Sequence, residues 1–202
     1  MKNANSLNSL GISLIKKGYH DEAINVFREA IDLKPDFAEA YINLGNAFTD
    51  VGRFDEAIIV YKKAIELQPN NTTTYNNLGN VLREKDLLDE AIIYYRKAIE
   101  LQPDYVDAYY NLGVALGYKG YFDEQIAAYR KVIELQQNNA VVYNYLGVAL
   151  ENKNHFTEAI SAYQKALELQ PGYSLAQNNL ESLLRRLSEQ AKNLSRNEHK
   201  PL

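Results

Sequence analysis

The stretch AEAYINLGNAFTDVGRFDEAIIVYKKAIELQPNN, residues 38–71, decides the fold, because it recurs along the chain at an offset of 34 residues. One register of the recurrence is a glycine that follows a leucine, at Gly11, Gly45, Gly79, Gly113 and Gly147. Another register is a proline, at Pro35, Pro69, Pro103 and Pro171, with Gln137 interrupting the series. A period of this length indicates an array of stacked repeats rather than an ordinary globular domain.

Each copy of the stretch has the pattern of two amphipathic helices. In residues 38–71 the apolar and small side chains lie three and four positions apart, which is the helical period. Gly52 is expected in the turn between the two helices, since glycine accepts a positive φ. The second helix should end before Pro69, which cannot continue a helix. Asp36 should cap the first helix, with Glu39 three residues later completing a reciprocal cap.

The same pattern divides residues 1–173 into five repeats, at residues 4–37, 38–71, 72–105, 106–139 and 140–173. Repeat 1 has Leu7 and Leu14 where repeat 2 has Tyr41 and Phe48, a difference that suits a terminal repeat whose outer face meets water. Residues 174–194 are expected to form a capping helix, and residues 195–202 a frayed polar tail. The apolar stripe of the capping helix consists of Ala176, Leu180, Leu183, Leu184, Leu187, Ala191 and Leu194.

The composition excludes several classes of protein. A formal charge of −4 gives no electrostatic reason to expect nucleic acid as a partner. The chain has no cysteine, no signal-like start and no apolar run near the roughly 18 residues of a membrane span, so we expect a soluble, cytoplasmic protein without a membrane partner. His20, His155 and His199 have no spaced partners for metal binding or acid–base work. We therefore expect no enzyme activity, no metal and no cofactor.

The repeat resembles the tetratricopeptide repeat pattern W-x2-L-G-x2-Y…A-x3-F…A…P. Repeat 2 matches this pattern at Tyr41, Leu44, Gly45, Phe48, Ala57, Tyr61, Ala64 and Pro69. The resemblance covers nearly the whole chain, from about Ala4 to the C-terminal helix. It implies an all-α fold, a right-handed superhelical α-solenoid of antiparallel helix pairs with a concave inner face. It also implies a protein-interaction scaffold.

Repeat 4 departs from the pattern at Gln125, Val132 and Gln137. The first two stand where small alanines are needed for close helix contacts, and larger side chains there typically cost about 1–3 kcal/mol. One interpretation is that neighbouring residues have changed to accommodate them. The other is that repeat 4 is a weak joint or a contact for another subunit. On this second interpretation, replacing Gln125 with alanine is expected to stabilise the array.

The resemblance places the first helix of each repeat along the concave groove, where a peptide would bind. The candidate ligand-binding residues on this face are Asn43, Asn77 and Asn111 with Tyr145 in one register, Asn46 and Asn80 one turn further on, Ile42, Asn76, Tyr110 and Asn144 beside them, and Arg83. A column of amides can hold the backbone of an extended peptide, and the neighbouring apolar side chains can supply pockets. The column resembles the asparagine ladder of O-linked N-acetylglucosamine transferases.

The alternative for these asparagines is a local role, with each amide hydrogen-bonded to the adjacent turn or to water. The lysines and arginines that hold a C-terminal carboxylate in chaperone-binding members of the family are absent from the equivalent positions, which favours a neutral or mildly basic ligand.

Three functions follow as hypotheses. The first is a scaffold that binds an extended segment of a partner protein in its groove. The second is a structural protein that forms a homo-oligomer through its C-terminal helix or its repeat ends. The third is a recruiting arm for a separate enzyme.

Overall fold

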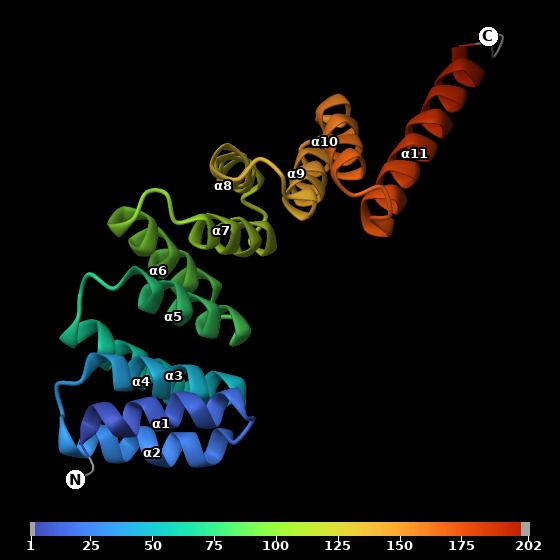
Figure 1. Cartoon of the computed structure of the whole chain (residues 1–202). Coiled ribbons are helices and arrows are strands. Elements are labelled where there is room, and N and C mark those ends of the chain that lie inside the picture. The colour runs from blue at the N-terminus through green and yellow to red at the C-terminus, as the bar shows by residue number, and fades with distance from the viewer. Residues whose placement is uncertain (1–2, 199–202) are drawn as a thin grey trace. The chain divides into compact units, whose positions relative to one another are not determined.

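The computed structural model describes residues 3–198, with side chains up to residue 193. Within that range the chain forms eleven α-helices and no β-strand (Figure 1). Their bounds are α1 Ala4–Lys16, α2 His20–Leu33, α3 Ala38–Asp50, α4 Phe54–Leu67, α5 Thr72–Glu84, α6 Leu88–Leu101, α7 Val106–Tyr118, α8 Phe122–Leu135, α9 Ala140–Asn152, α10 Phe156–Leu169 and α11 Ser174–Glu198.

The first ten helices follow one another two to a repeat, in the order that the sequence predicts. Contacts pair α1 with α2, α3 with α4, α5 with α6, and α9 with α10. Three residues join the two helices of a pair, and so short a connection makes them antiparallel neighbours. The all-α class and the α-solenoid of helix pairs are therefore confirmed. Contacts group the chain into an amino-terminal unit, up to Ala115, and a carboxy-terminal unit, from Leu116 onward.

Most of the helix ends follow the sequence signals, but one predicted cap is wrong. Gly52 has a φ of +75°, and α4 ends at Leu67, two residues before Pro69. Asp36 does not cap α3, because the N-cap residue is Phe37, which makes no side-chain cap hydrogen bond. Side-chain caps occur instead where asparagine holds the N-cap position, as at Asn71, whose Oδ1 accepts from the backbone N–H of Thr74 at 3.0 Å.

The register glycines make room for an aromatic ring on the partner helix. A Cβ at Gly45 would lie 2.6 Å from the ring of Tyr61, and one at Gly79 would lie 2.6 Å from the ring of Tyr95. These tyrosines are 1% and 0% exposed, so neither ring can move aside into solvent. The glycine–aromatic contact therefore fixes how closely the two helices of a repeat approach.

The outer face of repeat 1 is formed by other residues than the sequence suggests. Leu7 is 3% exposed and packs in the core, and Leu14 is half-buried. The water-facing positions are Ser6 and Ser13, both exposed, together with Leu10, which is 47% exposed. The equivalents of the two serines are buried in every later repeat, at Ala40, Ala47, Thr74, Val81, Ala108, Ala115, Val142 and Ala149.

Helix α11 docks like the first helix of a further repeat. Ala176 and Leu183 occupy the two inward positions and are 0% exposed. The register that holds glycine in the five repeats holds Glu181 here, and it is exposed. An aromatic ring cannot lie against the helix backbone at that position, so α11 is not shaped to receive a second helix of the repeat type.

Helix α11 is also longer than predicted. It starts at Ser174, as expected, but continues to Glu198 without the turn that follows every other first helix. Residues 195–198, predicted as part of a polar tail, are thus helical in their backbone. The predicted stripe residue Leu194 and the tail residues 199–202 lie outside the part of the chain for which side chains or backbone are described.

Repeat 4 accommodates its unusual glutamine through a second change, at Gly117. Gln125 is 7% exposed, and a Cβ at Gly117 would lie 2.2 Å from its Nε2 atom. Repeats 2, 3 and 5 have larger side chains in the register of Gly117, at Thr49, Arg83 and Glu151. Gln125 therefore uses space that Gly117 leaves. Its buried Oε1 makes no hydrogen bond to any described residue.

Candidate peptide-binding groove

Two columns of asparagine run across the first helices of the amino-terminal unit. The outer column is Asn43, Asn77 and Asn111, on α3, α5 and α7. The inner column, one helical turn further along, is Asn46 and Asn80 on α3 and α5. All five side chains are half-buried, so they are held by their surroundings and still reach solvent.

Each outer-column amide donates a hydrogen bond to the preceding repeat. The Nδ2 of Asn43 donates to Oδ1 of Asn8 at 2.9 Å, and the Nδ2 of Asn111 donates to Oδ1 of Asn76 at 3.0 Å. Asn8 and Asn76 hold the same register and are 6% and 4% exposed. The columns thus connect successive repeats through buried amide acceptors, whose loss would leave a donor without its partner.

Repeat 2 breaks this register with Ile42, and the hydrogen bond shifts by one turn. The Nδ2 of Asn77 donates to Oδ1 of Asn46 at 3.0 Å. The inner column therefore supplies the acceptor where the usual one is missing.

The inner column is oriented by buried tyrosines of the second helices. The hydroxyl of Tyr61 donates to Oδ1 of Asn46 at 2.6 Å, and that of Tyr95 donates to Oδ1 of Asn80 at 2.9 Å. Burial raises the pKa of Tyr61 to about 12 and also raises that of Tyr95, so both hydroxyls stay protonated as donors near neutral pH.

These hydrogen bonds engage the two columns through opposite ends of the amide. An outer-column amide donates one of its two N–H groups to its neighbour, and its Oδ1 and second N–H take no part in that bond. An inner-column amide has its Oδ1 engaged, by two donors in the case of Asn46, which leaves its NH2 group for a ligand. The inter-repeat bonds therefore leave the oxygens of the outer column and the NH2 groups of the inner column unengaged.

The other candidates of the amino-terminal unit lie around these columns. Ile42 and Tyr110 are half-buried, whereas Asn76 is buried as an acceptor for the outer column. The side chain of Arg83 is 24% exposed and its Nη2 lies 2.9 Å from the Glu84 carboxylate, which offsets its charge.

In the carboxy-terminal unit the same registers carry different chemistry. Asn144 is 4% exposed and its Oδ1 accepts from the Nδ2 of Asn179 on α11 at 2.9 Å, the same inter-repeat bond as in the other unit. Tyr145 is 37% exposed, and its ring stacks on that of Tyr129 at 5.9 Å between centroids. Asn144 is thus a buried acceptor that holds α11, and Tyr145 is an exposed aromatic side chain.

A second tyrosine network of this unit anchors α11. The hydroxyl of Tyr163 donates to Glu151 at 2.8 Å, and Arg186 of α11 donates to the other oxygen of that carboxylate at 2.6 Å. Burial and the neighbouring carboxylate both raise the pKa of Tyr163.

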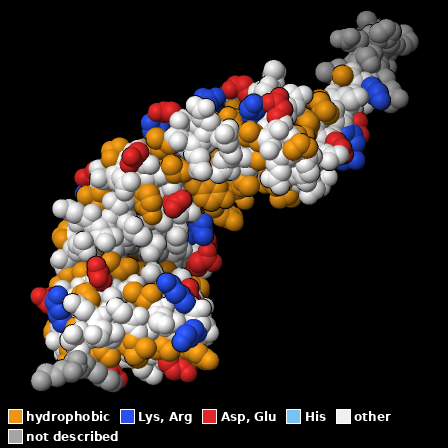
Figure 2. Space-filling model, in the orientation of Figure 1, with side chains coloured by type: hydrophobic (Ala, Val, Ile, Leu, Met, Phe, Trp, Pro, Cys, Tyr) orange, Lys and Arg blue, Asp and Glu red, His pale blue; other side chains and the backbone are white. Residues whose placement is uncertain are grey.

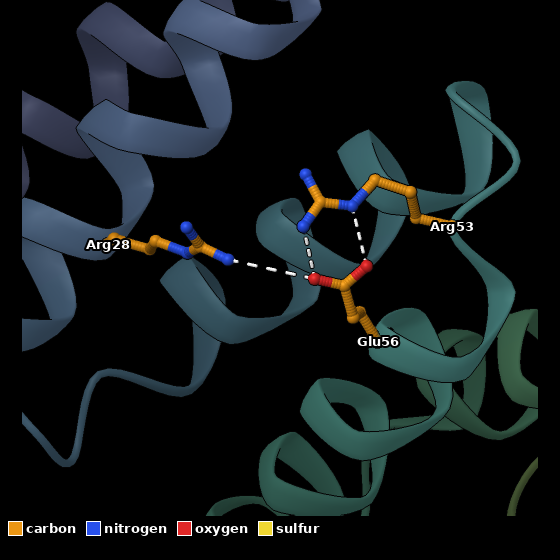
Figure 3. Close-up of polar contacts among 3 residues, drawn as sticks. All are labelled: Arg28, Arg53 and Glu56. Atoms are coloured by element: carbon orange, nitrogen blue, oxygen red, sulfur yellow. Dashed lines mark hydrogen bonds and ion pairs between the residues drawn. The ribbon is translucent and has the colours of Figure 1, made fainter.

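An ion-pair cluster joins repeats 1 and 2 on the side of the second helices. Glu56, in the first turn of α4, bridges Arg53 and Arg28 of α2, the latter at 3.8 Å (Figure 3). Both guanidinium groups also lie over the buried ring of Phe48, Arg53 at 4.7 Å and Arg28 at 5.5 Å from its centroid. Elsewhere on the face in Figure 2, side chains of both charges are interspersed.

Within residues 3–198 no helix is both long and apolar enough to cross a membrane. The same range contains no group of three or more His, Asp or Glu side chains that could hold a metal ion.

The sequence predicted the columns but not what orients them. Asn8 was available as a signal, because it shares a register with Asn76 and Asn144. The hydroxyls of Tyr61 and Tyr95 reach the inner column because the register glycines let their rings lie so close.

The helix pairs, their glycine–aromatic contacts and their inter-repeat amide bonds define the class of protein, an α-solenoid built from one helix-pair repeat. Sequence models described as "TPR repeat" match residues 11–51, 45–86 and 79–120, and models described as "Tetratricopeptide repeat" match residues 106–139 and 140–173. The chain therefore belongs to the tetratricopeptide repeat family. Proteins of this family act as interaction scaffolds with protein or peptide partners.

Solved structures give the same result. One, titled "Crystal structure of MamA", is 31% identical, covers 81% of this chain and 96% of its own length, and superposes with a TM-score of 0.77. MamA from Desulfovibrio magneticus RS-1 is 22% identical over 84% of this chain and 96% of its own, with a TM-score of 0.78. YrrB, whose title describes "a TPR protein with an unusual peptide-binding site", is 24% identical over 87% and 91%, with a TM-score of 0.76. No curated protein sequence matches the chain significantly.

Proposed function

We propose that the amino-terminal unit binds an extended segment of a partner protein along its two asparagine columns. The observation that carries the proposal is that the hydrogen bonds leave the amide oxygens unengaged on the outer column and the NH2 groups unengaged on the inner column. An extended backbone has one N–H donor and one C=O acceptor per residue and needs partners for both. Because buried hydrogen bonds orient the amides in advance, a ligand would not have to order them on binding.

The charges of this face favour a neutral or mildly basic segment. Glu39, Asp50, Glu84 and Asp107 lie exposed on the first helices. The cation among the candidate residues, Arg83, is paired with one of them at 2.9 Å. An acidic ligand would meet like charges here, whereas a lysine or arginine beside the backbone would be attracted.

The first experiment removes the outer column. Unstructured peptides selected for binding to the full chain are titrated against wild type and the N43A/N77A/N111A variant, and we expect a loss of affinity of at least tenfold. The matched control, N25A/N70A, deletes two exposed amides outside the first helices and should bind as wild type does. Unchanged affinity in the triple variant, with its helical circular dichroism intact, contradicts the proposal.

The second experiment changes the polarity of the inner column without disturbing its support. Asn46→Asp and Asn80→Asp keep an oxygen that accepts from Tyr61 or Tyr95, but they replace the ligand-facing NH2 with an acceptor. We expect the doubly substituted chain to keep its fold and lose peptide affinity. Equal or tighter binding of uncharged peptides would show that the inner column does not donate to the ligand backbone.

A second function, association of two copies through α11, is favoured by one observation. Leu184 of α11 is 47% exposed, and Glu181 keeps a repeat-type helix of the chain from covering this face. Light scattering over a range of concentrations should show a dimer for wild type and a monomer for Leu184→Glu, while Ser182→Glu on another face changes nothing. A strict monomer at every concentration rejects this function.

A further inference from the structure

An open apolar pocket lies on the second-helix side of repeat 5, away from the asparagine registers. It has a volume of about 350 Å³ and lies between α8, α9 and α10. Its floor is apolar, with Leu146, Leu150 and Ala162 at 8%, 2% and 6% exposure. Its rim carries an ion pair, Arg130 to Glu158 at 2.8 Å, whose side chains are 58% and 54% exposed.

The same place in repeat 2 is filled by the chain itself. Phe48 is 2% exposed and fills the space beneath Arg28 and Arg53. Glu56 holds the two guanidinium groups over the ring (Figure 3). The arrangement is an aromatic ring under a cation that a carboxylate neutralises, a favourable contact for the face of a π system.

Three repeats later, one arginine and the glutamate of this frame are kept, but His155 replaces Arg53 and the ring is missing. The equivalents of Arg28, Phe48 and Glu56 are Arg130, Leu150 and Glu158. Two further positions shrink at the same time, since Ile59 and Val60 become Ser161 and Ala162. Both smaller residues line the pocket. The pocket is therefore what remains when smaller side chains replace a phenylalanine and two branched residues while Arg130 and Glu158 keep their places; Thr157 in the lining also replaces Asp55.

We propose that this pocket binds one aromatic side chain of a partner protein, in the position that the ring of Phe48 takes in repeat 2. Arg130 offers its guanidinium to the ring face, and Glu158, with His155 at 3.5 Å on its other side, holds that guanidinium in place. An aliphatic side chain fills the same floor but lacks the π face that complements the cation. The proposal is independent of the asparagine columns, because it uses other residues on another side of the repeat.

The test uses N-acetyl-phenylalaninamide as the probe, with N-acetyl-leucinamide as its aliphatic counterpart. Amide chemical shifts of the isotope-labelled full chain are followed during titration. We expect saturable shifts in α9 and α10, with the phenylalanine probe binding at least threefold more tightly. Equal affinity for both probes, or shifts confined to other helices, overturns the proposal.

Variants that restore the repeat 2 residues should close the pocket. Leu150→Phe places the chain's own ring there and is expected to weaken binding of the probe at least tenfold. Because a core change can disturb folding, Ser161→Ile at the exposed rim provides a second test with the same expectation. Ala127→Ile, the same register in repeat 4, is the matched control and should bind as wild type does.

The cation is tested separately. Arg130→Gln keeps the pocket but removes the charge, so the preference for the phenylalanine probe over the leucine probe should fall toward one. If Arg130→Gln keeps the wild-type preference for the phenylalanine probe, the guanidinium does not interact with the aromatic face. The chemistry proposed for the ligand is then rejected.

Discussion

The packing of Gln125 against Gly117 predicts that the two residues are energetically coupled. Replacing Gln125 with alanine removes a buried acceptor that has no partner, a gain of about 1–3 kcal/mol. The same change loses about 0.8 kcal/mol for a buried methylene and opens a cavity of roughly 50 Å³, costing about 1.2 kcal/mol. These contributions nearly cancel. We expect Q125A alone to change the free energy of unfolding by less than about 1 kcal/mol, below the gain expected from the sequence.

The reciprocal change at Gly117 should depend on what stands at position 125. Alanine gains about 1 kcal/mol over glycine within a helix, but its Cβ would lie 2.2 Å from Nε2 of Gln125. Overpacking of this kind costs about 1–3 kcal/mol, so G117A should destabilise the wild type by about 1 kcal/mol. In the Q125A background the obstruction is gone, and the same change should stabilise by about 1 kcal/mol. The coupling energy is then about 2 kcal/mol.

Urea denaturation of the four proteins measures this coupling, provided that the m-value stays constant across the set. The control is Gly147→Ala, whose Cβ would lie 2.5 Å from the ring of Tyr163 and should destabilise with or without Q125A. If G117A and Q125A add within about 0.5 kcal/mol, as independent sites do, Gln125 does not fill the space at Gly117 and the reasoning is wrong.

Three further outcomes are expected. Because burial raises the pKa of Tyr61 from 10.0 to about 12, the stabilisation that comes from its protonated hydroxyl is complete below pH 10 and is lost as the pH rises toward 12. Between these values the free energy of unfolding of the wild type should fall by about 1.4 kcal/mol per pH unit more than that of Tyr61→Phe. Parallel plots of unfolding free energy against pH for the two proteins would contradict this. Glu56→Gln should destabilise in dilute buffer but not in about 1 M salt, where exposed charges are screened, whereas Glu66→Gln should have less effect. Asn8→Ala should cost about 0.5–1.5 kcal/mol by removing an inter-repeat acceptor, while its exposed neighbour Ser9→Ala stays neutral; equal losses would deny Asn8 that role.

The fold could be predicted from the sequence because each structural position occurs in five repeats, so a constraint on it is seen several times. Gly45 alone says little, but a glycine at the same place in five successive copies indicates a constraint on backbone approach. Aromatic rings lie against four of these positions, Gly11, Gly45, Gly79 and Gly147. The cap at Asp36 was mispredicted because its spacing fits equally well when the helix begins one residue later than assumed.

The polarity of the site could not be read from the sequence. Which way an amide points is set by hydrogen bonds between residues about 35 positions apart, such as Asn8 with Asn43, and by tyrosine hydroxyls from the other helix of the repeat. The exchange of partners at Asn77 depends on side-chain conformation, which a periodic pattern does not specify. The role of Gly117 could not be predicted either, because it depends on the contact of Gly117 with the side chain of Gln125.

Glu181 has a consequence for engineering the chain. Since a stack of repeats grows by adding units that contact only their neighbours, copies can be inserted or deleted where each first helix carries the glycine that receives the ring of its own second helix. Helix α11 lacks that glycine, so a second helix joined after it could not pack an aromatic ring there, whereas a whole repeat inserted before Ser174 would contact an unchanged surface. Repeats can therefore be added or removed only on the amino-terminal side of α11, because of Glu181.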